Sequence, residues 1–202
     1  MILPIPLQCF LNGGTGFVVS SHARPWLVTC IHIVTGKVKN TTDASQFSGA
    51  SLRVLGSDLV LPLVVDGKQA FIAVNDPGKD GRILDIMAIP LSDSQYDQLS
   101  GYGSYDVKAI CDIEMGEEVS AYGFAGINLL SEPKVSSFSG KILKENTARF
   151  VVDAPSAKGL SGSAVTSKNG LVGIMYGDEG SDEAPVAATC VRLNVVKPAI
   201  FL

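Results

Sequence analysis

Short runs of apolar residues alternate with Gly, Pro, Asp and Asn along most of the chain, and this pattern predicts β-strands. Asp66-Gly67 lies between two such runs and predicts a hairpin, because glycine tolerates the positive φ of a tight primed turn. No long segment keeps a helical period, although 94–99 and 194–202 have room for a short helix. The expected strands occupy 16–20, 26–30, 59–65, 69–74, 85–91, 118–122, 135–142, 148–152, 163–167, 171–176 and 187–193.

A less apolar stretch, 92–106, divides these strands into two series. It contains two glycines among Ser, Tyr and Asp, which suits a connection between two halves of the chain. The class predicted is all-β, built as one large β domain or as two small barrels.

Composition and charge argue against two classes of function, nucleic-acid binding and membrane binding. The chain has 202 residues, of which 46% are hydrophobic and 18% charged, and its formal net charge is -4. Acidic and basic residues are interspersed, so no strong field is expected that would attract nucleic acid or an anionic membrane. The opening segment, 1–7, has no basic region, and no apolar run approaches the roughly 18 residues that cross a bilayer. We therefore expect a soluble, cytoplasmic protein with neither kind of partner.

The four cysteines are Cys9, Cys30, Cys111 and Cys190. They are widely scattered and contain no CxxC pair with metal-ligand spacing. Without an export signal we expect thiols rather than disulfides. We expect no metal and no cofactor.

The strongest local chemical signal is the run Gly159-Leu160-Ser161-Gly162-Ser163-Ala164. Glycines on both sides of a serine permit a tight loop that projects the hydroxyl and gathers N–H groups around an anion. Such a loop suits a nucleophile with an oxyanion hole. The alternative is an ordinary surface turn, in which Gly and Ser are also common.

Two further polar residues interrupt apolar strands. His32 lies in the run 26–34, at the end of an apolar strand, where it is either a proton acceptor and donor or a hydrogen-bonded core residue. Asp85 lies in the run 83–91 and needs either a buried partner or a solvated strand end. A buried partner could be the N–H of the His32 ring, which would fix its tautomer.

The order His, Asp, Ser, and the runs around these residues, resemble the trypsin-like (chymotrypsin-fold) serine peptidases. The nearest resemblance is to the minimal bacterial HtrA-like branch without a PDZ domain. The matching segments are GTGF at 14–17, TCIH at 29–32, DIMAI at 85–89, YGF at 122–124, the loop 153–164 and GLVGI at 170–174.

This resemblance implies two packed, six-stranded antiparallel β-barrels with the active site in the cleft between them. The N-terminal barrel would span 1–94, the connection 95–105, and the C-terminal barrel with its tail 106–202. The implied function is a serine endopeptidase that cleaves a polypeptide substrate through an acyl-enzyme. The implied triad is His32, Asp85 and Ser161, and the N–H groups of Gly159 and Ser161 would form the oxyanion hole. The implied substrate-binding residues are Ala154, Pro155, Lys158, Met175, Tyr176 and Gly177.

Departures from the family pattern add three expectations. Leu160 replaces the Asp that pairs with a newly cut N-terminus in zymogens, so activity is either constitutive or switched by a regulatory protein partner. Ser163 is a rival to Ser161 as nucleophile. No acidic residue lies in 154–158, which favours a small or apolar P1 residue. The alternative function is a catalytically inactive peptidase fold that serves as a binding module.

Overall fold

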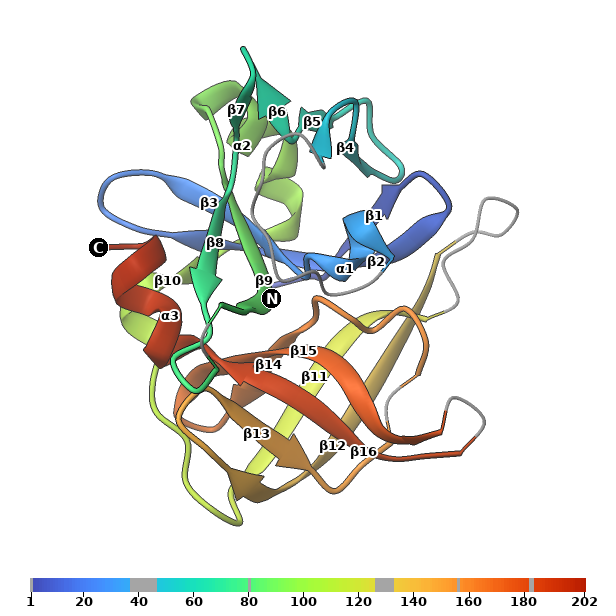
Figure 1. Cartoon of the computed structure of the whole chain (residues 1–202), viewed down its shortest axis with the longest axis vertical. Helices are drawn as coiled ribbons and strands as arrows, with labels where there is room; N and C mark the ends of the chain where they lie inside the picture. The colour runs from blue at the N-terminus through green and yellow to red at the C-terminus, as the bar shows by residue number, and fades with distance from the viewer. Residues whose placement is uncertain (1, 37–46, 80, 126–132, 156, 182–183) are drawn as a thin grey trace.

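The computed structural model describes residues 2–36, 47–79, 81–125, 133–155, 157–181 and 184–202. Figure 1 shows two β-structures stacked along the long axis of the molecule, formed by the N-terminal and the C-terminal halves of the chain. Almost every strand has at least one buried face, as the apolar runs in the sequence predict. The expected all-β class is confirmed.

The N-terminal half is a curled sheet. Eight strands pair in the order β5-β4-β1-β2-β3-β9-β8, with β10 attached to β2, and β6 and β7 form a separate hairpin. Asp66 and Gly67 join that hairpin with φ values of 50° and 72°, so the predicted turn is confirmed. The bounds are β1 Ile5–Cys9, β2 Asn12–Ser20, β3 Pro25–Thr29, α1 His32–Thr35, β4 Ser51–Val54, β5 Val60–Pro62, β6 Val64–Val65, β7 Lys68–Gln69, β8 Ile72–Asn75 and β9 Ile83–Pro90.

The C-terminal half is a closed antiparallel barrel in the order β11-β12-β13-β16-β15-β14. Its interior is filled by a core of its own, which includes Phe138, Phe150 and Leu160. The bounds are β11 Glu118–Ala125, β12 Lys134–Glu145, β13 Arg149–Val152, β14 Ala164–Ser167, β15 Gly170–Ser181 and β16 Ala184–Arg192.

The connection between the halves is partly helical and returns to the N-terminal sheet. A capping box of Ser92 and Gln95 begins α2, Asp93–Leu99, and the 3-10 turn η2, Ser100–Tyr102, follows it. Strand β10, Tyr105–Asp106, then pairs in parallel with β2 before the 3-10 turn η3, Val107–Ala109.

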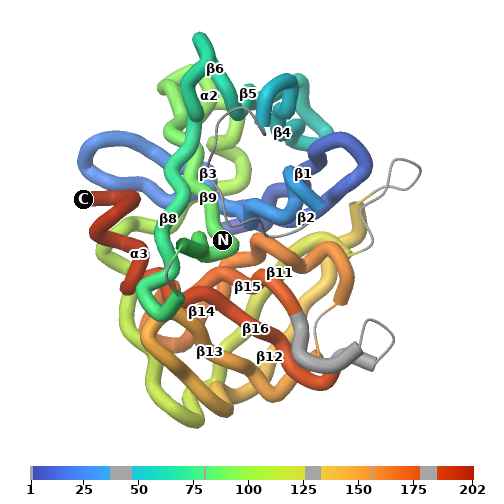
Figure 2. The backbone as a smooth tube through the Cα atoms, viewed as in Figure 1, coloured from blue at the N-terminus to red at the C-terminus, as the bar shows by residue number. Residues whose placement is uncertain are grey.

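The last helix, α3, Leu193–Ile200, leaves the C-terminal barrel and packs beside β8 of the N-terminal half (Figures 1 and 2). Its buried residues belong to the N-terminal core, and Phe201 just beyond it makes an edge-to-face contact with Trp26 at 6.3 Å between ring centroids. None of the helices in the described part of the chain is long and apolar enough to span a bilayer.

The expected architecture needs one adjustment. Two β-structures are present, and the C-terminal one is a closed six-stranded barrel as expected, but the described N-terminal strands form an open, curled sheet with one parallel pair. Strands β1 and β4 were not predicted from the pattern. Both are short, and β1 contains Pro6, which has no N–H to give to a ladder.

Candidate active site

His32 and Asp85 are brought together by neighbouring elements of the N-terminal half. Strand β3 ends at Thr29, and His32 is the first residue of α1, which faces the C-terminal barrel (Figure 1). Strand β9 pairs with β3 and carries Asp85. The His32 ring nitrogen Nδ1 lies 2.5 Å from Asp85 Oδ2, and the backbone N–H of His32 donates to Asp85 Oδ1 at 3.0 Å.

This contact decides between the alternatives left open for Asp85. Asp85 is only 2% exposed and lies inside β9, so it is not at a solvated strand end. A carboxylate only accepts hydrogen bonds, so in the neutral imidazole Nδ1 of His32 carries the proton and Nε2 presents a lone pair. The His32 side chain is 26% exposed and can receive a proton from a group in front of it.

Cys30 lies close behind this pair. Its thiol, the ring of His32 and the carboxylate of Asp85 offer donor atoms within 4.8 Å of one another. The thiol donates instead to the carbonyl of Met175 at 3.3 Å. Burial and the nearby charge of Asp85 raise the pKa of the Cys30 thiol well above its usual value, so it stays protonated.

Ser161 lies on the loop between β13 and β14, at the junction of the two halves. Its carbonyl accepts a hydrogen bond from Thr15 N–H of β2 at 2.8 Å. The same stretch of β2 contacts Ile33, because a Cβ at Gly14 would meet both the Ile33 side chain and the Ser161 carbonyl. Ser161 is thus close to the segment that carries His32. Among the described residues, its hydroxyl makes no hydrogen bond to the His32 ring.

The loop has the backbone expected for an anion site. Gly159 and Gly162 have φ values of 100° and 89°, which side-chain-bearing residues rarely adopt. The N–H of Gly162 donates to Met175 at 2.8 Å. In the described part of the chain, by contrast, the N–H groups of Gly159 and Ser161 have no acceptor. These two groups are the ones predicted to bind an oxyanion.

Ser163 does not compete with Ser161 for the role of nucleophile. Its side chain is fully buried, and a Cβ added at Gly123 would lie 2.1 Å from its hydroxyl oxygen. Ser161 is half-buried and keeps access to solvent. Of these two serines, Ser161 is therefore the one that can be reached from solvent without rearrangement of the barrel.

The predicted substrate-binding residues differ in their exposure. Pro155 and Lys158 are exposed and Ala154 is buried. The Met175 side chain belongs to the barrel core. The backbone N–H and carbonyl of Met175 both bond the loop 153–163 that carries Ser161, the predicted nucleophile loop. Gly177, farther along β15, faces open space, since a Cβ there would meet nothing within 4 Å.

A hollow beside Tyr176 was not found by sequence reasoning. It has a volume of about 320 Å³, and the guanidinium of Arg149 lies 6.0 Å from the centroid of the Tyr176 ring. Arg149 also donates to Asp76, on the turn between β8 and β9, at 2.6 Å. The lining residues are Lys144, Glu145, Asn146, Arg149, Phe150, Val151, Tyr176 and Thr189.

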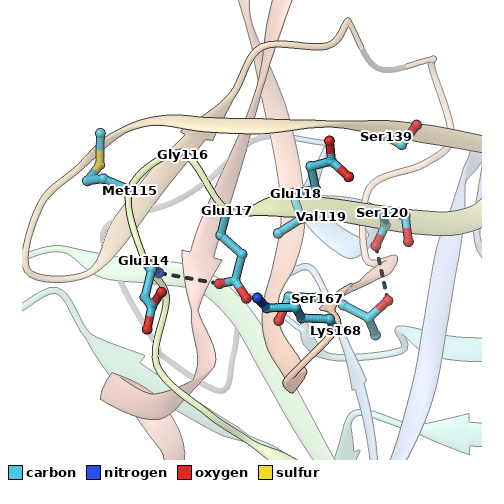
Figure 3. A pocket seen from close by; sticks show the side chains of 11 residues that line it. Glu114, Met115, Gly116, Glu117, Glu118, Val119, Ser120, Ser139, Ser167 and Lys168 are labelled. Atoms are coloured by element: carbon cyan, nitrogen blue, oxygen red, sulfur yellow. Dashed lines mark hydrogen bonds between the residues drawn. The ribbon is translucent and has the colours of Figure 1, made fainter.

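A larger hollow, of about 700 Å³, lies on the C-terminal barrel and contains none of the predicted site residues (Figure 3). Glu117 points into it, but its carboxylate already accepts hydrogen bonds from the Glu114 N–H at 3.3 Å and from the Asn169 amide at 2.9 Å. This carboxylate fixes the loop before β11. The size of the hollow does not make it the chemical site.

Comparison with known proteins adds information on the fold. No protein-family model matches the sequence, and no curated protein matches it. Solved structures do match. The serine protease domain of the Sesbania mosaic virus polyprotein is similar with a TM-score of 0.58 and 19% identity, over 92% of this chain and 84% of that one.

Two other solved structures of proteases are also similar. Glu endopeptidase has a TM-score of 0.57 and 14% identity, over 97% of this chain and 89% of that one. The active form of the Rv3671c protease from M. tuberculosis has a TM-score of 0.55 and 14% identity, over 98% of this chain and 80% of that one. The feature of this chain that matches the protease fold is the pairing of a closed six-stranded barrel with a curled, half-barrel sheet. The chain therefore has the fold of the chymotrypsin-like serine proteases.

Proposed function

We propose that this chain is a serine endopeptidase that hydrolyses peptide bonds through an acyl-enzyme on Ser161. The observation that carries the proposal is the arrangement of His32, whose ring is held by the buried Asp85 and whose second ring nitrogen has no hydrogen-bond partner among the described residues. A positioned base beside a glycine-flanked serine is the arrangement that activates a hydroxyl nucleophile. The protease-like fold supports the proposal.

The proposed reaction follows from these positions. The Ser161 oxygen attacks the peptide carbonyl while His32 Nε2 takes its proton, and Asp85 stabilises the imidazolium that forms. The N–H groups of Gly159 and Ser161 bind the oxyanion, a contact worth about 3 kcal/mol per donor. His32 then gives the proton to the leaving amine. Water attacks the acyl-enzyme with His32 again as base, which releases the acid and restores Ser161.

Among the described residues, the Ser161 hydroxyl makes no hydrogen bond to the His32 ring, and this is compatible with the proposed role. In enzymes without substrate, the bond between nucleophile and base is often long and tightens only when substrate binds. The substrate we propose is a polypeptide with a small or apolar P1 residue. No acidic side chain is present at 154–158, where it would pair with a basic P1 group.

The test uses a fluorophosphonate probe and a series of peptide substrates on the purified chain. Ser161→Ala should abolish both labelling and hydrolysis while leaving the melting temperature within about 2 °C, because the half-buried hydroxyl has no structural partner among the described residues. Ser163→Ala is the matched control and should keep both activities. Loss of activity in Ser163→Ala alone would contradict the assignment.

The second candidate function is an inactive peptidase fold that binds a polypeptide. It is favoured by one observation, the absence of a hydrogen bond between the Ser161 hydroxyl and His32 in the described residues. An intact, folded protein that neither labels nor hydrolyses any substrate would support this function instead.

A further inference from the structure

Thr15 of β2 is buried between the two halves and contacts the nucleophile loop directly. Its side chain is fully buried. The hydroxyl donates to the Gly159 carbonyl at 3.1 Å and accepts from the Phe124 N–H at 2.9 Å. Its backbone N–H donates to the Ser161 carbonyl at 2.8 Å. One residue of the N-terminal half therefore bonds the loop on both sides of Leu160.

The contact between Thr15 and the loop is also steric. A Cβ added at Gly162 would lie 1.8 Å from the Thr15 carbonyl oxygen, so only glycine allows this approach. The same carbonyl accepts a hydrogen bond from the Thr29 hydroxyl at 2.6 Å, which holds Thr15 in place. The loop can neither move closer to β2 nor leave it without breaking these bonds.

These bonds determine the direction of the Ser161 N–H, one of the two proposed oxyanion donors. The peptide units Gly159–Leu160 and Ser161–Gly162 flank the unit that carries the Ser161 N–H. Thr15 bonds the carbonyl of each flanking unit, and a planar peptide turns as one body. Fixing both neighbours therefore fixes the N–H between them.

We propose that Thr15 is a positioning residue for the catalysis proposed above, whose hydroxyl holds the nucleophile loop in its oxyanion-binding arrangement. Leu160 offers no charge for an ion pair at this loop; its side chain is instead buried in the barrel core. The loop is ordered by a neutral hydroxyl from the other half of the same chain. Peptidase activity then needs neither cleavage of the chain nor a partner protein.

The hydroxyl group matters more than the volume of the side chain. Thr15→Val keeps the shape but leaves the Gly159 carbonyl and the Phe124 N–H without their shared partner. Thr15→Ser keeps the hydroxyl and loses one methyl group. A role in positioning therefore predicts that Ser rescues activity and that Val does not.

The experiment compares Thr15→Val and Thr15→Ser with the wild-type full-length chain. In Thr15→Val we expect fluorophosphonate labelling and kcat to fall at least tenfold, with KM changed less than threefold, because the donors act on the transition state. Thr15→Ser should stay within threefold of wild type. Thr166→Val is the matched control, since it removes a β14 hydroxyl that bonds Ser120 and does not touch the loop; its activity should be unchanged.

The proposal is overturned if the wild-type chain labels and Thr15→Val labels equally fast, or if Thr15→Ser is impaired as much as Thr15→Val. If Thr15→Val does not fold, Thr15→Ala takes its place in the same comparison with Thr15→Ser.

If the wild type itself does not label, the proposed function fails, and hydrogen exchange of backbone amides still tests whether Thr15 positions the loop. The Gly162 and Leu160 amides should then exchange faster in Thr15→Val than in Thr166→Val, and equal rates overturn it.

Discussion

Asp85 is a carboxylate inside a strand whose residues are buried from Ile83 to Ile89. A buried charge without partners is costly, but Asp85 receives hydrogen bonds from two N–H groups of His32. The same hydrogen bonds therefore have two effects: they offset the free-energy cost of burying the carboxylate, and they orient the imidazole for the proposed catalysis. Replacing His32 leaves the buried carboxylate with the backbone N–H alone and also removes the proposed base.

Ser163 differs from Asp85, because its buried hydroxyl has no hydrogen-bond partner in the described part of the chain. A buried hydroxyl without a partner is unfavourable relative to a methyl group. We expect Ser163→Ala to raise the free energy of unfolding by about 1 kcal/mol, measured by urea denaturation. Ser137→Ala, at an exposed position on β12, should change it by less than about 0.5 kcal/mol. A clear loss of stability in Ser163→Ala would mean that the hydroxyl is bonded.

At the scale of elements, the turn between β8 and β9 joins the two halves through an ion pair. Asp76 accepts from the Gly78 N–H at 3.0 Å and from Arg149 of β13 at 2.6 Å. The Asp76 side chain is fully buried. Burial alone would raise the pKa of this carboxyl, but the hydrogen bonds from Arg149 and Gly78 outweigh it and lower the pKa below its usual value.

This ion pair predicts a pH-dependent difference between variants. A carboxyl with a lowered pKa in the folded state stabilises the protein above its ordinary pKa, and this stability is lost as the pH falls through the folded value. Asp76→Asn should lower the free energy of unfolding by about 3 kcal/mol at pH 7, because it leaves Arg149 without its buried partner. The difference from wild type should shrink below about pH 4.

Urea denaturation between pH 3 and pH 7 measures this difference. Asp66→Asn is the matched control, since Asp66 is exposed in a turn whose positive φ also suits Asn. It should change stability by less than about 0.5 kcal/mol at every pH. A difference for Asp76→Asn that stays constant down to pH 3 would argue against the linkage.

At the scale of the whole molecule, the chain crosses between its halves twice. The connection after α2 adds β10 to the N-terminal sheet, and α3 returns from the end of the C-terminal barrel to the N-terminal core. The nucleophile loop and His32 come from different halves, so these crossings help hold the site together.

A substitution at Phe201 tests how much the return of α3 to the N-terminal half contributes to stability. It is 95% buried against Trp26, and Phe201→Ala should lower the free energy of unfolding by about 3 kcal/mol through lost burial and a cavity. Leu202→Ala is the matched control, because Leu202 is largely exposed and should have almost no effect. Thermal and urea unfolding measure both. Equal stability of the two variants would show that the return of α3 contributes little.

Local pattern and side-chain chemistry were enough to predict the strand-rich class, the Asp66-Gly67 turn and the short helices near residues 94 and 194. These features depend on the period of apolar residues and on the φ preferences of Gly and Asp, which the sequence carries directly. The chemistry of a buried carboxylate allowed either a partner or a solvated strand end for Asp85, and the family resemblance implied the pairing with His32 that the structure shows.

Tertiary structure alone decided which of the two serines beside Gly162 is buried, and which distant hydroxyl bonds the loop. Ser161 and Ser163 look alike in sequence, but the packing of Gly123 against the loop encloses only Ser163. Thr15 belongs to the GTGF motif at 14–17, but the motif indicates no role for the Thr15 hydroxyl. Its partners lie more than 100 residues away, as do the two ends of the Trp26–Phe201 contact. Such contacts are set by how the sheets curl and pack, and no local propensity encodes them.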